Sequence, residues 1–104
     1  MILTTTDEIK GKTITKVLGL VKGNTVRTRW FGRDIAAALK NIIGGEIKSY
    51  TEMLTSARNE ATERMVEEAK KLGADAVVGI RFTIAEVMQG SSEILAYGTA
   101  VKLR

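Results

Sequence analysis

Three stretches of this 104-residue chain have the pattern of long β-strands, and each carries apolar or small residues on both of its faces. They cover residues 12–26, 75–87 and 93–104. Gly19 and Gly23 in the first stretch indicate a bulge or a close approach of another backbone. Because a sheet in water keeps two apolar faces only when both are covered, a chain of this kind must find two covering layers.

The helical segments amount to about one such layer. Ser49 and Glu52 fit a capping box, and apolar residues then recur at helical spacing, which predicts a long helix over residues 50–72. A short helix is predicted between an N-cap at Asp34 and the terminating Gly44-Gly45 pair, with Ile42 on its apolar face.

The last two strands are joined by Gln89-Gly-Ser-Ser92, which is typical of a hairpin. Alternation in the first strand of this hairpin predicts that Val78, Ile80, Phe82 and Ile84 share one face, with Val77 on the other. The first long strand can pair with the last. We therefore predict one α+β domain over residues 1–104, with a small antiparallel or mixed sheet, one long helix and one short helix.

Because the predicted helices are too few to cover both faces of the sheet, we expect the chain to self-associate. An uncovered face would expose several hundred Å² of apolar surface, and a second copy of the chain is the simplest cover. Ala96, Gly98 and Ala100 form a strip of small residues on the last strand, and we regard it as a candidate subunit-packing surface. Alternatively, the short helix and the N-terminal arm cover the second face within one copy.

Missing residue types exclude several kinds of chemistry. The chain contains no cysteine and no histidine, so it can form no zinc–thiolate site and no Ser-His-Asp arrangement. Its three internal methionines, Met53, Met65 and Met88, are expected to be core filler, and no EF-hand-like spacing appears. Lys, Tyr, Ser and carboxylates can catalyse reactions without histidine, but no pattern places them together. We expect no catalytic residue, no metal site and no cofactor.

The sequence also bears on location. Residues 1–8 do not resemble a signal peptide, and no apolar run approaches 18 residues, so neither secretion nor a membrane span is indicated. We expect a cytoplasmic protein.

Basic and aromatic residues interleave at Arg27, Arg29, Trp30, Phe31 and Arg33. Residues 1–33 hold seven basic and two acidic residues, a net charge of +5. Such a segment could bind an anion or a single-stranded nucleic acid, with the arginines on phosphates and the rings on bases. The alternative is burial at a subunit contact, where arginine and aromatic residues are enriched.

Several motifs recur in order along the chain: Gly19-Leu-Val-Lys-Gly23, Arg33-Asp-Ile, Ile42-Ile-Gly-Gly-Glu46, Tyr50, Ala57-Arg58, Gly73-Ala-Asp-Ala-Val-Val-Gly79 and Gly98-Thr-Ala-Val101. In these motifs the chain resembles the YbjQ-like family of small bacterial proteins. The resemblance implies an α+β domain that assembles into a ring-like homopentamer, and it carries a heavy-metal-binding label without an established activity. We expect a homopentameric structural or interaction protein. The alternative is a ring that binds an anion, a nucleic acid or a metal ion.

Overall fold

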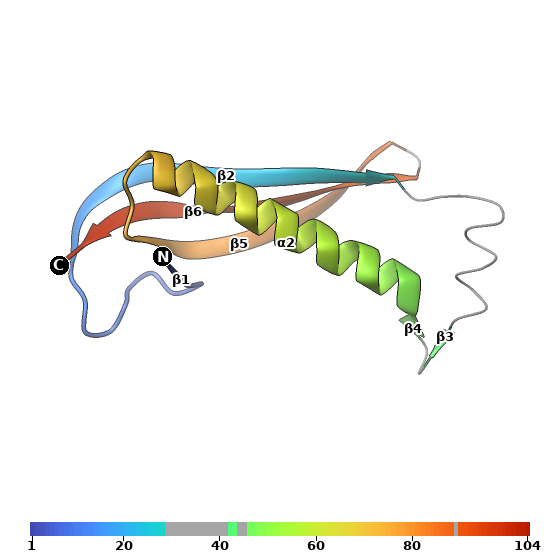
Figure 1. The fold of residues 1–104 in the computed structure, drawn as a ribbon, viewed down its shortest axis with the longest axis horizontal. Helices are drawn as coiled ribbons and strands as arrows, with labels where there is room; N and C mark the ends of the chain where they lie inside the picture. The colour runs from blue at the N-terminus through green and yellow to red at the C-terminus, as the bar shows by residue number, and fades with distance from the viewer. Residues whose placement is uncertain (29–41, 44–45, 89) are drawn as a thin grey trace.

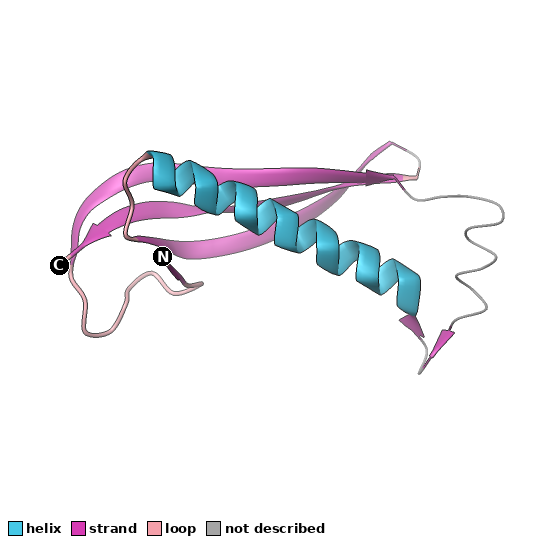
Figure 2. Ribbon diagram, in the orientation of Figure 1, coloured by secondary structure: helices cyan, strands magenta, loops and turns pink. Residues whose placement is uncertain are grey.

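A long helix lies along one face of a four-stranded sheet, so that the molecule has two layers (Figure 1). The computed structural model describes residues 1–28, 42–43, 46–88 and 90–104. The elements of the two layers are α2 (Lys48–Lys71), β1 (Ile2–Leu3), β2 (Ile14–Thr28), β5 (Ala76–Met88) and β6 (Ser91–Leu103). A separate two-stranded sheet contains β3 (Ile42–Ile43) and β4 (Glu46–Ile47) (Figure 2).

The strands of the main sheet follow the order β1-β5-β6-β2. Both β2 and β5 pair antiparallel with β6, so the predicted hairpin and the predicted pairing of the first long strand with the last are confirmed. β1 pairs parallel with the start of β5, which makes the sheet mixed. β1 was not predicted, because a strand of two residues is too short to show a periodic pattern.

The core lies between α2 and the sheet. Four fully buried side chains at four-residue intervals form the inner stripe of α2: Ala57, Ala61, Met65 and Ala69. Alanine side chains let the helix backbone come close to β2, where the hydroxyl of Thr25 donates a hydrogen bond of 3.2 Å to the carbonyl of Ala57. Gly23 lies directly under Ala61 with no room for a Cβ, so the predicted close approach is confirmed.

A bulge at Gly79 divides β5 into two halves. Gly79 has a φ of +62°, and the register with β6 shifts between Val78 and Arg81. Val77 and Ile80 therefore both join the core under α2, whereas Val78 packs on the opposite face. The predicted shared face of Val78 and Ile80 is wrong, because one inserted residue exchanges the faces of all that follow.

The N-terminal arm, residues 1–13, lies along the outer edge of the first half of β5. Thr4 donates its amide to the carbonyl of Val77 at 3.1 Å, and Gly79 donates its own to the carbonyl of Thr6 at 2.9 Å. The guanidinium of Arg81 donates to the carbonyl of Thr5 at 2.9 Å. These bonds attach the arm as far as the bulge.

Of the predicted short helix, the structure describes Ile42. Residues 34–41 lie outside the described residues, and Ile42 belongs to β3, so the prediction of helix at Ile42 is wrong. Within the described parts of the chain, no helix combines the length and the apolar character needed to cross a membrane.

Candidate functional site

The second half of β5, which we call the distal β5 segment, projects beyond the cover of the helix. Its residues 81–88 are all exposed, in contrast to the buried first half of the strand. Phe82 pairs with Ala96, and Ile84 pairs with Ile94. Paired residues share a face, so Phe82 and Ile84 lie on the α2 side of the sheet, where they remain 47% and 55% exposed.

The distal β5 segment also forms an open edge. The N-terminal arm bonds to β5 as far as Ile80, whose amide donates to the carbonyl of Thr4 at 3.1 Å. Beyond Ile80, none of the described residues pairs with the outer edge of β5. An exposed apolar edge strand is a template for pairing with another chain. The sequence showed Phe82 and Ile84 as apolar strand positions, but only the structure shows that the helix leaves them exposed.

Of the residues that the structure describes, those that cover the face of the sheet opposite α2 lie at one end of it. There Ile9 of the N-terminal arm packs against Ala76, Val78 and Val101. Farther along β2, the apolar side chains remain open to solvent, and the most exposed ones described are Val17, Leu20 and Val26. The arm therefore covers part of the second face, as one of the two alternatives expected. It leaves Val17, Leu20 and Val26 exposed on β2, with Lys22 and Asn24 between Leu20 and Val26 on the same face.

The predicted strip of small residues lies inside the protomer. Ala96 and Ala100 belong to the core beneath α2 and are fully buried. Gly98 is buried as well, and a Cβ there would stand 2.7 Å from a methyl carbon of Val77 and 3.1 Å from Ile80. The strip therefore serves the packing of α2 on the sheet within one copy of the chain.

The basic and aromatic segment cannot be placed as a unit. Arg27 belongs to β2, where it pairs with Ser92. Arg29, Trp30, Phe31 and Arg33 lie outside the described residues. Both interpretations of this segment, anion binding and burial between subunits, therefore remain predictions.

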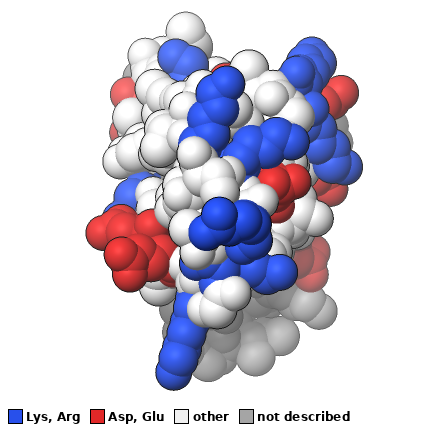
Figure 3. Space-filling model, turned by 90° about the vertical axis from the view of Figure 1, so that its left-hand side faces the viewer, with Lys and Arg blue, Asp and Glu red and all other residues white. Residues whose placement is uncertain are grey.

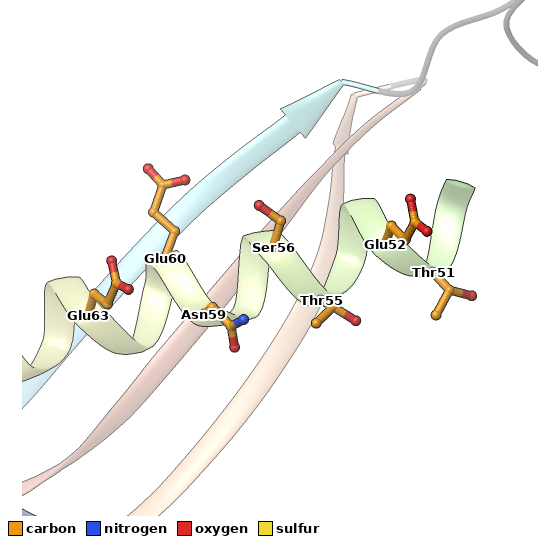
Figure 4. A pocket seen from close by; sticks show the side chains of 7 residues that line it. All are labelled: Thr51, Glu52, Thr55, Ser56, Asn59, Glu60 and Glu63. Atoms are coloured by element: carbon orange, nitrogen blue, oxygen red, sulfur yellow. The ribbon is translucent and has the colours of Figure 1, made fainter. Parts of the chain in front are cut away.

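A pocket of about 690 Å³ lies along the N-terminal half of α2 (Figure 4). Its described lining residues all belong to α2: Thr51, Glu52, Thr55, Ser56, Asn59, Glu60 and Glu63. In Figure 4 these side chains leave the helix in different directions, with Thr55 and Asn59 on one side and Ser56 and Glu60 on the other. Glu60 is also engaged in an ion pair with Arg64. The lining offers carboxylates and hydroxyls but, among the described residues, no convergent acid and base.

The donor atoms of the chain do not suit a heavy metal. Soft metals favour thiolate, thioether and imidazole ligands, and the sequence contains neither cysteine nor histidine. Of its methionines, Met65 is fully buried in the core as expected. Met88 is 66% exposed at the far end of β5, so the prediction that it fills the core is wrong. Among the described residues, no three carboxylates come close enough together to hold an ion.

Comparisons with known proteins place the chain among others of similar length. A family profile described as "Putative heavy-metal-binding" matches residues 1–104. A UPF0145 protein from Thermosipho africanus is 59% identical over 104 residues, which cover 100% of this chain and 96% of the relative. One from Vibrio parahaemolyticus is 61% identical over 103 residues, which cover 99% of this chain and 98% of the relative.

The fold also has a counterpart among solved structures. The crystal structure of a protein of unknown function from Pediococcus pentosaceus matches with a TM-score of 0.69 at 19% identity. The match covers 100% of this chain and 98% of the other. At that identity the likeness establishes the fold alone.

Proposed function

Since the chain belongs to the YbjQ-like UPF0145 family over its whole length, we propose that it acts as the subunit of a homo-oligomer, a ring-like pentamer with a structural or interaction role and no catalysis. The distal β5 segment carries this proposal. Its exposed apolar residues and its open backbone edge are features that a soluble monomer avoids, because they invite pairing with other chains.

A ring requires two different surfaces on each copy, because its contacts run head to tail. The described residues offer two. The first is the distal β5 segment with Phe82 and Ile84. The second is the outer face of β2, where Val17, Leu20 and Val26 are exposed alongside the polar Lys22 and Asn24. In the proposed ring, each copy contributes the first surface to one neighbour and the second surface to the other.

The absence of catalysis is part of the proposal. Two observations support it: the sequence lacks histidine and cysteine, and the described lining of the α2 pocket brings no acid and base together. Such a ring would then act through contacts of its surface with other molecules, and not by catalysing a reaction.

Light scattering behind a sizing column tests the assembly. We expect a wild-type mass near five times the chain mass of 11.3 kDa. The double variant Phe82→Ser/Ile84→Ser removes the apolar contacts of the first surface, and Leu20→Ser removes one from the second. Both variants should elute as monomers with unchanged far-ultraviolet circular dichroism.

Leu72→Ser is the matched control. Leu72 is similarly exposed, at 46%, but it follows the end of α2, away from both surfaces. This variant should keep the wild-type mass. A wild-type mass of one chain at micromolar concentration would refute the proposed assembly, and a stable mass of four or six chains would refute the pentamer alone.

A further inference from the structure

Cationic side chains gather at the end of the molecule where β2 begins and where β6 and α2 end (Figure 3). We call this surface the basic end. It consists of six exposed residues: Lys12, Lys16, Lys70, Lys71, Lys102 and Arg104. They are far apart in the sequence, so the cluster becomes visible only once the chain is folded.

Backbone pairing brings these residues together. Lys16 pairs directly with Lys102 across the β2–β6 ladder. One step outward, Thr13 donates its amide to the carbonyl of Arg104 at 3.3 Å and accepts the amide of Arg104 at 2.9 Å. Lys12 precedes Thr13 in the chain and so lies beside the same strand end.

The end of α2 joins the same cluster through its final turn. The ammonium of Lys102 comes within 3.9 Å of where a Cβ on Gly73 would stand. Gly73 in turn donates its amide to the carbonyl of Lys70 at 3.0 Å. Lys70 and Lys71 occupy the last turn of α2, so their charges belong to the same end of the molecule as the strand cations.

Within the described residues, none of these six cations forms an ion pair. Asp75 directly precedes β5 at this end of the sheet, and its carboxylate accepts a hydrogen bond of 2.9 Å from the amide of Leu103. Glu67 and Glu68 lie near the end of α2, and Asp7 and Glu8 belong to the N-terminal arm. Six cations against these five carboxylates leave a net charge of +1, or +2 when Lys10 of the arm is included.

The Lys16–Lys102 pair has a cost that the fold itself does not explain. Cations in the last turn of a helix are favourable, because they complement its dipole, and this accounts for Lys70 and Lys71. Like charges directly opposite each other on paired strands are unfavourable. A bound anion would turn the repulsion between Lys16 and Lys102 into attraction for a ligand.

We infer that the basic end binds the phosphodiester backbone of nucleic acid without reading its sequence. Long, exposed side chains that are not held by ion pairs suit a repeating charge, because each contact releases counterions. The basic end as defined consists of lysine and arginine side chains alone, without a ring on which a base could stack, so its contacts would be with phosphates and not with bases. All six belong to one copy, so binding does not depend on the proposed ring. An assembly would add avidity.

Fluorescence anisotropy with a labelled DNA duplex of mixed sequence tests this inference. The Lys16→Gln/Lys102→Gln variant should bind about tenfold more weakly than the wild type in low salt. The slope of log K against log salt should fall by about 1.8, since each lost phosphate contact removes about 0.9. Lys22→Gln/Arg58→Gln is the matched control, because it removes the same net charge from exposed positions outside the basic end. Its affinity should change less than about twofold, as for surface residues that do not touch the DNA.

Stability provides a second measurement. Removing the repulsion at Lys16 and Lys102 should leave the thermal midpoint equal or higher, so weaker binding cannot be attributed to unfolding. If the double variant fails to fold, Arg104→Gln alone serves the same comparison. Absence of wild-type binding to the duplex at 50 mM salt would overturn the inference, as would an equal loss in the control variant. Binding to inorganic polyphosphate or to anionic vesicles but not to DNA would overturn it too.

Discussion

Gly23 of β2 lies so close to Ala61 of α2 that a Cβ on the glycine would overlap the carbonyl oxygen of the alanine. The same Cβ would come within 2.8 Å of the Cβ of Arg64. The obstacle is helix backbone, which cannot rotate aside as a flexible side chain can. Packing of α2 on the sheet therefore depends on a glycine at this position.

Gly23→Ala should consequently destabilise the fold. We expect a loss of about 1–3 kcal/mol in the free energy of unfolding, because the helix must lift from the sheet to admit one methyl group. Urea unfolding at fixed protein concentration measures it. Lys22→Ala, at the exposed neighbouring position, should change the free energy by less than about 0.5 kcal/mol. Equal stability of Gly23→Ala and wild type would show that the helix does not pack this closely.

Asp75 should stabilise the end of the sheet through its hydrogen bond to the amide of Leu103. Asp75→Ala removes the acceptor, and we expect a loss of about 1–2 kcal/mol in the free energy of unfolding. Asp75→Asn keeps a carbonyl oxygen in the same place and should recover most of that loss. If both variants lost the same amount, the carboxylate charge and not the hydrogen bond would be responsible.

Amide hydrogen exchange should distinguish the two halves of β5. Residues 76–80 have bonded neighbours on both sides within one copy, so their protection should not depend on assembly. Residues 82–88 should exchange more slowly in the wild type than in Phe82→Ser/Ile84→Ser, because the proposed ring covers them. Mass spectrometry of peptides from each half provides the comparison. Equal exchange of the distal peptide in both proteins would argue against its burial between copies.

Soft metal ions should bind weakly or not at all, despite the description of the family profile. Titration calorimetry with zinc or copper(I) should give no stoichiometric heat at micromolar protein, because the sequence has no thiolate or imidazole to offer. Thermal midpoints with and without the ions should agree as well. Stoichiometric heat that disappears in a Met88→Leu variant would contradict this prediction and would identify an exposed thioether as a ligand.

Much of the fold was predictable, because long periodic segments carry strong signals. The first strand, the long helix and the hairpin were each expected within two residues of their observed bounds. Gly19 was expected to mark either a bulge or a close approach of another backbone, and its φ of +127° and the register shift beside it show the bulge. Each of these features depends on a local sequence pattern, which can be recognised without knowing which distant segments are in contact.

Other features depended on contacts that the sequence does not display. In the sequence, Gly79 looks like any other glycine in a strand. The bulge that it forms places Val78 and Ile80 on opposite faces of the sheet, although they were expected to share one. The parallel pairing of β1 rests on a few hydrogen bonds between distant segments. The basic end arises from strand register and from the turn after α2, and neither follows from composition.

The two chain ends, which lie on the side of the molecule away from the β5–β6 turn (Figure 1), have a practical consequence. A purification tag or fluorophore fused to either terminus would stay clear of the distal β5 segment, so tagged protein suits the measurements of mass. A tag after Arg104 would emerge among the lysines that we assign to DNA. Binding measurements therefore call for protein from which the label has been cleaved.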